Sequence, residues 1–292
     1  MKKKSSLKHT GAFWAFCAPC CILFGVFFLV PLVLSIAFSF TNYDGWKTMD
    51  FVGLKNYITL FKDSKFYLSL GRTLLYTVCT LPFRVIIPLL VAVLLCSKRV
   101  AAKSLTRTMV YIPVLMSALV VGITINWMFS QEYGLVNFII RSLGGTALEW
   151  SLNPRLATFV ISFASVWASI GFNMILYIGG INSISNDLYE AATIDGASGV
   201  QAFFRITVPM LAPTTFMVVL LSTVNLLKEY ALVQGITQGG PGLSTTFIIQ
   251  YIFDKGFNQM QYGYASAIST VVMIIFALIA FAQFKVNNGG ET

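Results

Sequence analysis

Long apolar runs separated by short polar stretches dominate this sequence. Each run is near or above the roughly 20 residues that an α-helix needs to cross a hydrocarbon core about 30 Å thick. The first run exceeds the roughly 7 to 15 apolar residues of a signal peptide, and no small-x-small cleavage site closes it, so we expect it to be retained. We predict an all-α integral membrane protein whose bundle of six transmembrane helices spans residues 13–40, 70–95, 109–129, 156–181, 210–233 and 264–284. A kink is expected in the first span at Pro19 or Pro31.

Composition and charge support a membrane protein and indicate its orientation. Of the 292 residues, 57% are hydrophobic and only 11% are charged, whereas a soluble domain has about 25% charged residues. The net charge of +9 would suit nucleic acid, but its distribution argues against that partner. The basic residues cluster beside apolar runs, at Lys2, Lys3, Lys4, Lys8, Lys98, Arg99, Lys103 and Arg107. Such clusters mark cytoplasmic ends, so six crossings place both tails, residues 1–12 and 285–292, and the loop 182–209 in the cytoplasm.

The polar loop 182–209 between the fourth and fifth runs is predicted to form two short helices. Asn186 can serve as the N-cap of the first, and Gly196 supplies the left-handed residue that ends it. Ser198 and Gln201 form a capping box for the second. On the first helix, one face is shared by Leu188, Ala191 and Ala192, and on the second, helical spacing relates Val200, Phe203, Phe204 and Thr207. The two small alanines would let another protein approach this face closely.

The same loop carries a family resemblance. YEAATIDGAS at residues 189–198, followed by FFRITVP at 203–209, resembles the EAA motif of permeases in binding-protein-dependent ABC importers. In that family the loop is a cytoplasmic coupling-helix pair that inserts into a groove of an ATPase subunit; the alternative is an ordinary helical hairpin between two spans. The resemblance implies that the ATPase-coupling residues are Leu188, Glu190, Ala191, Ala192, Asp195, Gly196, Ile206 and Pro209.

Further matches extend the resemblance over residues 13–284, which we take as one permease domain. TNYD at 41–44, FVGLKNY at 51–57, and T-x-G-G-P at 237–241 with GYASA at 263–267 resemble the branch that transports maltose, lactose and glycerol phosphate. The chain would then be a permease subunit that translocates a sugar or oligosaccharide across the bacterial cell membrane. Its implied partners are a second homologous permease, two ATPase subunits, an extracellular solute-binding protein and the lipid bilayer. Two positions depart from the family: Ser185 replaces a common proline, and Ala231 replaces a frequent aspartate.

Other classes of function find less support in the residues. The glycine-rich stretch 239–242 lacks the Lys-Ser/Thr of a phosphate loop, and no nucleophile, base and metal constellation appears, so we expect no enzyme activity. ATP and Mg²⁺ are expected on the partner subunits, and no cofactor in this chain. Cys17-x-x-Cys20 has no second cysteine pair, and His9 is the only histidine, so we predict neither a metal site nor a disulfide. The alternative function is an ion-coupled secondary transporter of a small polar solute, which would need intramembrane carboxylates and usually internal repeats.

Two stripes of polar residues are candidates for the lining of a substrate pathway, because hydrocarbon offers polar groups no partner. They occupy the fourth and fifth spans, at Ser162, Ser165, Ser169, Asn173, Ser222, Asn225 and Glu229. The alternative is that these side chains bond neighbouring helices together. In the fourth span, Trp167 and Phe172 either stack on a sugar ring or belong to the core.

Arg84 lies near the middle of the second predicted span, roughly 20 Å from either end. An unpaired arginine there costs at least about 2.5 to 3.5 kcal/mol, so it should face the bundle interior. Three partners are open at this point: Glu229, a group in the second permease, or an anionic substrate. Lys228, after a long apolar run, is expected to reach the outer interface.

Overall fold

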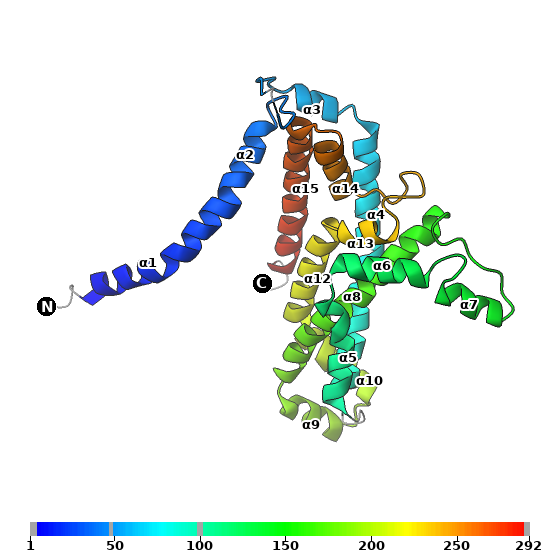
Figure 1. Ribbon diagram of the computed structural model, residues 1–292. Helices are drawn as coiled ribbons and strands as arrows, with labels where there is room; N and C mark the ends of the chain where they lie inside the picture. Colours follow the sequence, from blue (N-terminus) through cyan, green and yellow to red (C-terminus); the bar gives the residue numbers. More distant parts are fainter. Residues whose placement is uncertain (1–4, 47–48, 98–101, 289–292) are drawn as a thin grey trace. The chain divides into compact units, whose positions relative to one another are not determined.

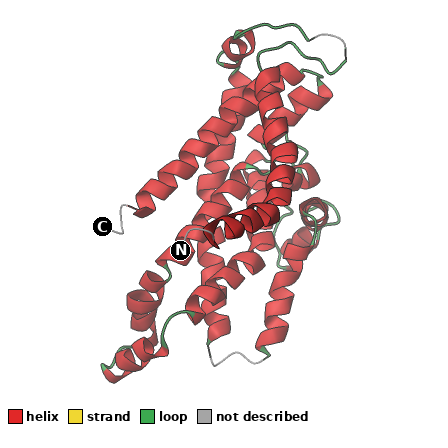
Figure 2. Cartoon of the chain, turned by 90° about the vertical axis from the view of Figure 1, so that its left-hand side faces the viewer, coloured by secondary structure: helices red, strands yellow, loops and turns green. Residues whose placement is uncertain are grey.

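The computed structural model describes residues 5–46, 49–97 and 102–288, and within these ranges it contains helices, turns and one isolated antiparallel bridge between Thr41 and Phe51 (Figures 1 and 2). Most of the predicted basic clusters, Lys2, Lys3, Lys4, Lys98 and Arg99, lie outside the described residues. The chain divides into two compact units, residues 1–64 with 252–275, and residues 65–251 with 276–292. The predicted all-α fold is confirmed for the described part of the chain.

The first unit combines the N-terminal helices with a segment from near the C-terminus. It holds α1 (Ser5–Phe24), the π-helical turn η1 (Gly25–Leu29), α2 (Val30–Phe38), α3 (Lys55–Leu60), the π-helical turn η3 (Asp254–Asn258) and the first half of α15 (Tyr262–Asn288). Side chains join these distant segments: Asn56 Nδ2 donates to the carbonyls of Ser39 and Thr41 at 2.9 and 2.8 Å, and the Tyr264 hydroxyl donates to Asp63 at 2.6 Å.

The backbone of the first span departs from a regular α-helix just before Pro31, while the predicted kink stays a prediction. Pro19 is inside the regular helix α1, whereas the turn η1 ends two residues before Pro31, with the Val30 N–H bonded to the Gly25 carbonyl. Because Pro31 has no N–H to donate to the preceding turn, the backbone there closes one wider turn instead.

The second unit contains the other helices. They are α4 (Ser64–Cys96), α5 (Lys103–Leu115), α6 (Ala118–Met128), α7 (Leu135–Ser142), α8 (Pro154–Asn182), α9 (Asn186–Ile194), α10 (Gly199–Ala202), the π-helical turn η2 (Phe203–Thr207), α11 (Val208–Met210), α12 (Ala212–Leu227), α13 (Ala231–Ile236) and α14 (Ile248–Phe253). The unit also holds the part of α15 after residue 275, while Ser64 and the last two residues of α14 belong to the first unit. The short helix α7 was not predicted. It is held by the buried Asn137, whose side chain bonds the backbone of Gln131 and Leu148 and the Trp150 indole at 3.0 Å each.

Four helical stretches of the described chain are long and apolar enough to cross a membrane by themselves: 16–38, 64–96, 154–182 and 262–286. Two bent pairs, 103–115 with 118–128 and 199–210 with 212–227, turn by 100° and 66°, and six spans result if each pair counts as one. The third and fifth predicted spans, 109–129 and 210–233, are therefore not continuous helices over their predicted bounds. The third breaks at Met116 and Ser117, whose ψ angles of 145° and 136° are extended, and in the fifth the helix α12 ends at Leu227 rather than continuing to residue 233.

Close glycine contacts explain where the short helices pack. A Cβ on Gly122 of α6 would lie 3.0 Å from the Gly235 Cα of α13, and one on Gly235 would lie 2.8 Å from the Leu119 carbonyl. Backbones can approach this closely only where both positions lack a side chain. The crossing seals a hydrophobic cluster that joins α4, α6, α8 and α13 through buried residues including Tyr76, Val121 and Ile161. A second cluster, with Ala92, Met174 and Val218, joins α4, α8 and α12 nearer the loop 182–209.

Candidate functional site: a capped loop and a buried polar cluster

The first helix of the loop 182–209, α9, has well-formed ends. Its N-cap is Ser185, whose hydroxyl accepts from the Asp187 N–H at 3.3 Å, so the prediction of Asn186 as N-cap was wrong by one residue. At the other end Gly196 has φ +76°, and the Ala197 N–H reaches back to the Ala192 carbonyl at 2.8 Å. This left-handed termination matches the role predicted for Gly196. Ser185, at a position that departs from the resembled family, thus caps the helix itself.

The second helix of the loop begins at the predicted capping box. The Gln201 side chain accepts from the Ser198 N–H at 2.8 Å, and the Ser198 hydroxyl accepts from the Gln201 N–H at 3.3 Å. The π-helical turn η2 follows and ends just before Pro209, with the Val208 N–H bonded to the Phe203 carbonyl. A hydrogen bond of 2.9 Å between the Tyr189 and Thr207 hydroxyls ties the two helices together.

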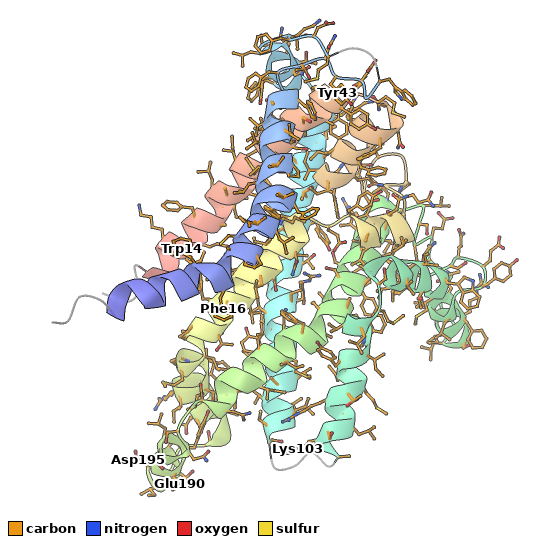
Figure 3. All side chains as sticks on the ribbon, turned by 60° about the vertical axis from the view of Figure 1, so that its left-hand side comes forward. Trp14, Phe16, Tyr43, Lys103, Glu190 and Asp195 are labelled. Carbon is orange, nitrogen blue, oxygen red and sulfur yellow. The ribbon has the colours of Figure 1, made fainter. Side chains whose placement is uncertain are left out.

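Most of the predicted coupling residues lie at the surface of the loop. Glu190 and Asp195 are exposed near its tip (Figure 3). Leu188 is 42% exposed, and Ala191, Gly196 and Pro209 are exposed while Ala192 is half-buried. Ile206 differs, because it packs with Tyr189 against the second hydrophobic cluster.

Large apolar side chains complete this surface. Ile194, Val200 and Phe204 are 86%, 68% and 64% exposed. Ile194 was not among the predicted coupling residues, although its place four residues after Glu190 put it on the same side of the predicted helix. Rigid caps with exposed apolar and acidic side chains make this surface suitable for docking a protein.

Away from the loop, four predicted pathway residues meet in one buried cluster. Arg84 of α4 is 6% exposed, and its Nε and one Nη atom donate to the Ser165 carbonyl of α8 at 3.2 and 3.1 Å. The Asn173 side-chain amide donates to the Arg84 carbonyl at 2.9 Å and to the Ser222 hydroxyl of α12 at 3.2 Å. The Ser165 carbonyl is a partner that the sequence analysis did not consider for Arg84.

Glu229 lies close enough to this cluster for its charge to interact with Arg84. Its carboxylate accepts from the Leu232 N–H at 3.2 Å and so caps the start of α13. Glu229 is half-buried, while the adjacent Lys228 is exposed. The side chain therefore connects the end of α12 to the short helix that follows it.

The other predicted pathway residues are placed differently. The Ser169 hydroxyl bonds to the Val166 carbonyl in its own helix at 2.9 Å, and Trp167 packs against the first hydrophobic cluster. Phe172 is 43% exposed, and Asn225 is exposed as well. The Ser162 hydroxyl accepts from Thr80 of α4 at 3.0 Å.

A polar stripe on α4 was missed in the sequence. It consists of buried side chains at helical spacing, Ser69, Thr73, Tyr76, Thr77, Thr80 and Arg84. The spacing of three and four residues was the available signal, but only Arg84 stood out because of its charge. Two buried hydroxyls in this region, of Tyr76 and Ser165, have no hydrogen-bond partner among the described residues.

The described residues offer no group of three or more histidine, cysteine, aspartate or glutamate side chains that could hold a metal ion. The five cysteines are free thiols.

Comparison with known proteins gives consistent results. Residues 57–288 match the family described as "Binding-protein-dependent transport system inner membrane component". The chain is 32% identical to the arabinooligosaccharides transport system permease protein AraP of Bacillus subtilis (strain 168), over 94% of this chain and 88% of that one. It is also 32% identical to the lactose transport system permease protein LacF of Rhizobium radiobacter, over 93% and 92%. Among solved structures, a chain of a bacterial ABC transporter involved in import of the acidic polysaccharide alginate matches with a TM-score of 0.84 and 23% identity, over 97% of both chains, a likeness of fold.

Proposed function

Because this chain belongs to the family of binding-protein-dependent transport system inner membrane components, we propose that it is a permease subunit that carries a sugar or oligosaccharide into a bacterial cell. The observation that carries the proposal is the 32% identity, over more than nine-tenths of the chain, to permeases named for arabino-oligosaccharides and lactose. The four candidate spans, or six if each bent pair counts as one, together with the family match support a multi-pass protein of the inner membrane.

The working assembly would contain this chain, a second homologous permease, two ATPase subunits and an external solute-binding protein. ATP hydrolysis would occur on the ATPase subunits. One solved relative of the fold is described as bound to its pentasaccharide-loaded periplasmic protein, which supports delivery of the substrate from outside. No observation favours the ion-coupled alternative over this assembly.

We place the loop 182–209 and both tails, residues 1–12 and 285–292, in the cytoplasm. Within the second unit, Lys103 lies at the same end as Glu190 and Asp195 (Figure 3). Basic residues gather at cytoplasmic ends of spans, so this shared end supports an inner position for the loop.

The loop is proposed to dock into a groove of an ATPase subunit. The caps at Ser185, Gly196 and Ser198 hold its two helices in fixed geometry, and the Tyr189–Thr207 bond fixes one helix to the other. A rigid loop does not deform when the ATPase subunit moves, so it passes the displacement on to the helices joined to it. Closure of the ATPase pair would then move α8 and α12, the two long helices to which the loop is joined.

The substrate pathway is proposed to follow the polar faces of α8 and α12. Ser165, Asn173 and Ser222 are its buried members, whereas Ser169, Asn225 and Glu229 are more accessible. Hydroxyl and amide groups suit the hydroxyls of a sugar, and Phe172 offers an exposed ring. Trp167 would act through packing rather than direct contact.

Uptake measurements test this function. Cells lacking the gene for this chain, with and without a plasmid copy, would be given radiolabelled arabinotriose, lactose, maltotriose or an alginate trisaccharide, with histidine as a control. We expect plasmid-dependent, vanadate-sensitive uptake of at least one sugar and unchanged uptake of histidine. Uptake that follows the proton gradient and resists vanadate, or plasmid-dependent uptake of histidine alone, would contradict the proposal.

A further inference from the structure

A proline in α4 leaves one backbone carbonyl of the buried cluster without its usual hydrogen-bond donor. In an α-helix the carbonyl of residue 84 accepts from the N–H of residue 88, but residue 88 is Pro88, which has no N–H. Pro88 and Arg84 are both buried, so the Arg84 carbonyl could not turn to water. The Asn173 amide of α8 fills this position at 2.9 Å. The proline and the asparagine are therefore complementary parts of one contact.

The contact is reciprocal between the two helices. While Asn173 of α8 binds the backbone of Arg84, the Arg84 guanidinium binds the backbone of α8 at Ser165, through two N–H groups. Ser165 and Asn173 are eight residues apart, which is about 12 Å along a helix. Two attachments at this separation restrain α4 and α8 against both sliding and rotation, which one contact could not do.

A third helix joins through the same amide. Asn173 Nδ2 also donates to the Ser222 hydroxyl of α12 at 3.2 Å. Since α8 leads directly into α9, and α12 follows α11, the Asn173–Ser222 bond connects the two arms that carry the loop 182–209. Seven residues beyond Ser222, Glu229 caps α13 and interacts with the charge of Arg84.

We propose that Arg84 and Asn173 are positioning residues that make α4, α8 and α12 move together, so that displacement of the loop 182–209 reaches the break between α12 and α13. We call the contacts of Arg84 and Asn173 with Ser165 and Ser222 the clasp. This inference rests on the proposed function and adds a route for its coupling. Arg84 on α4 and Asn173 on α8 lie between residues of the two hydrophobic clusters, while Ser165 lies among those of the first. The clusters hold the helices together by apolar packing, and the clasp supplies the directional contacts that apolar packing lacks.

Pro88→Ala separates this role from general stability. The substitution returns an N–H to residue 88, which competes with Asn173 for the Arg84 carbonyl. Pro82→Ala is the matched control, because Pro82 lies in the same helix but is exposed. Asn173→Ala removes both contacts of the amide and is the second test variant.

The experiment detects movement of α12 through the reactivity of one introduced cysteine thiol. In a chain whose five native cysteines are replaced by serine, Asn225→Cys reports on α12, and the complete complex is purified with its sister permease and ATPase subunits. The rate of reaction with a charged methanethiosulfonate is measured in the resting complex and after trapping with ATP and vanadate. The amount of trapped nucleotide is measured in the same samples, so that the ATPase side and the membrane side are read separately.

The parent is the chain without native cysteines that carries Asn225→Cys. We expect trapping to change its thiol reaction rate by at least about fivefold, and to do the same when Pro82→Ala is added. In Pro88→Ala the nucleotide should still be trapped but the rate change should fall below about twofold, and Asn173→Ala should also lose the rate change. If Pro88→Ala and Asn173→Ala trap nucleotide and keep the parental rate change, the clasp has no coupling role. If the parent itself traps no nucleotide, the proposed function fails, and the clasp's role in coupling fails with it.

Discussion

The loop 182–209 and the clasp are built by opposite means. The helix ends of the loop are fixed mainly by contacts between residues two or three positions apart, such as Ser185 with Asp187 and Ser198 with Gln201, and most of its predicted coupling residues are exposed. The clasp joins residues 49 to 89 positions apart, and its side chains are buried. A surface built locally can exchange exposed side chains without disturbing the fold. The residues that form a buried contact among three helices must be replaced together, because a partner left alone becomes an unsatisfied buried polar group.

The largest effect is expected from a buried change in the clasp. Asn173→Leu keeps the branching of the side chain but leaves the Arg84 carbonyl and the Ser222 hydroxyl without their amide donor. Each buried polar group that loses its partner costs about 1 to 3 kcal/mol, so with two such groups we expect the free energy of unfolding to fall by about 2 to 6 kcal/mol. Thermal unfolding of the purified complex in detergent checks this, and unchanged stability would show that the contacts at Asn173 are dispensable.

A substitution in the loop should lower the free energy of unfolding less than Asn173→Leu does, and it should weaken assembly with the ATPase subunits more. Gly196→Val forces a β-branched residue to φ +76°, which costs roughly 1 to 2 kcal/mol and shifts the end of α9. We expect normal insertion in the membrane but weaker association with the ATPase subunits, measured by co-purification. Gly199→Val, at an exposed glycine of the same loop without positive φ, is the control and should retain the subunits.

Contacts between neighbouring residues were predicted from the sequence more accurately than contacts between distant residues. Gly196 and the Ser198–Gln201 box were predicted correctly, because caps depend on neighbouring residues alone. Asn186 was wrong by one position because two adjacent residues, Ser185 and Asn186, both suit an N-cap, and helix ends are uncertain at that scale. The family, the helical class and the permease function were likewise confirmed, since long apolar runs and an extended motif carry them.

The breaks in the third and fifth spans could not be read from hydrophobicity. The apolar pattern continues on both sides of Met116 and Ser117, and the helix after this break packs through Gly122 against Gly235, more than a hundred positions away. The partner of Arg84 escaped prediction for a related reason. Every residue has a backbone carbonyl, so the sequence does not show which carbonyl lies near Arg84. Only the three-dimensional structure shows that it is the carbonyl of Ser165.

The smallest effect should follow removal of a single cap. Ser198→Ala deletes the hydroxyl that accepts from the Gln201 N–H, which is worth about 1 kcal/mol. The Tyr189–Thr207 bond and the packing of Ile206 still hold the second helix in place. We therefore expect sugar uptake to fall by less than about fivefold, since 1 kcal/mol corresponds to a factor of about five. Complete loss of uptake would mean that the capping box does more than hold the helix.

Contact between the loop and an ATPase subunit is the central claim, and site-specific photocrosslinking tests it most directly. A benzoylphenylalanine would replace Ile194 at the loop surface or, as a control, Leu243, which is also exposed but lies outside the loop; their side chains are 86% and 53% exposed. Irradiation of intact cells followed by immunoblotting for the ATPase subunit reads both positions. The account predicts a crosslink to the ATPase subunit from residue 194 and none from residue 243. A crosslink from residue 243, or none from residue 194 in a complex that retains its ATPase subunits, would contradict it.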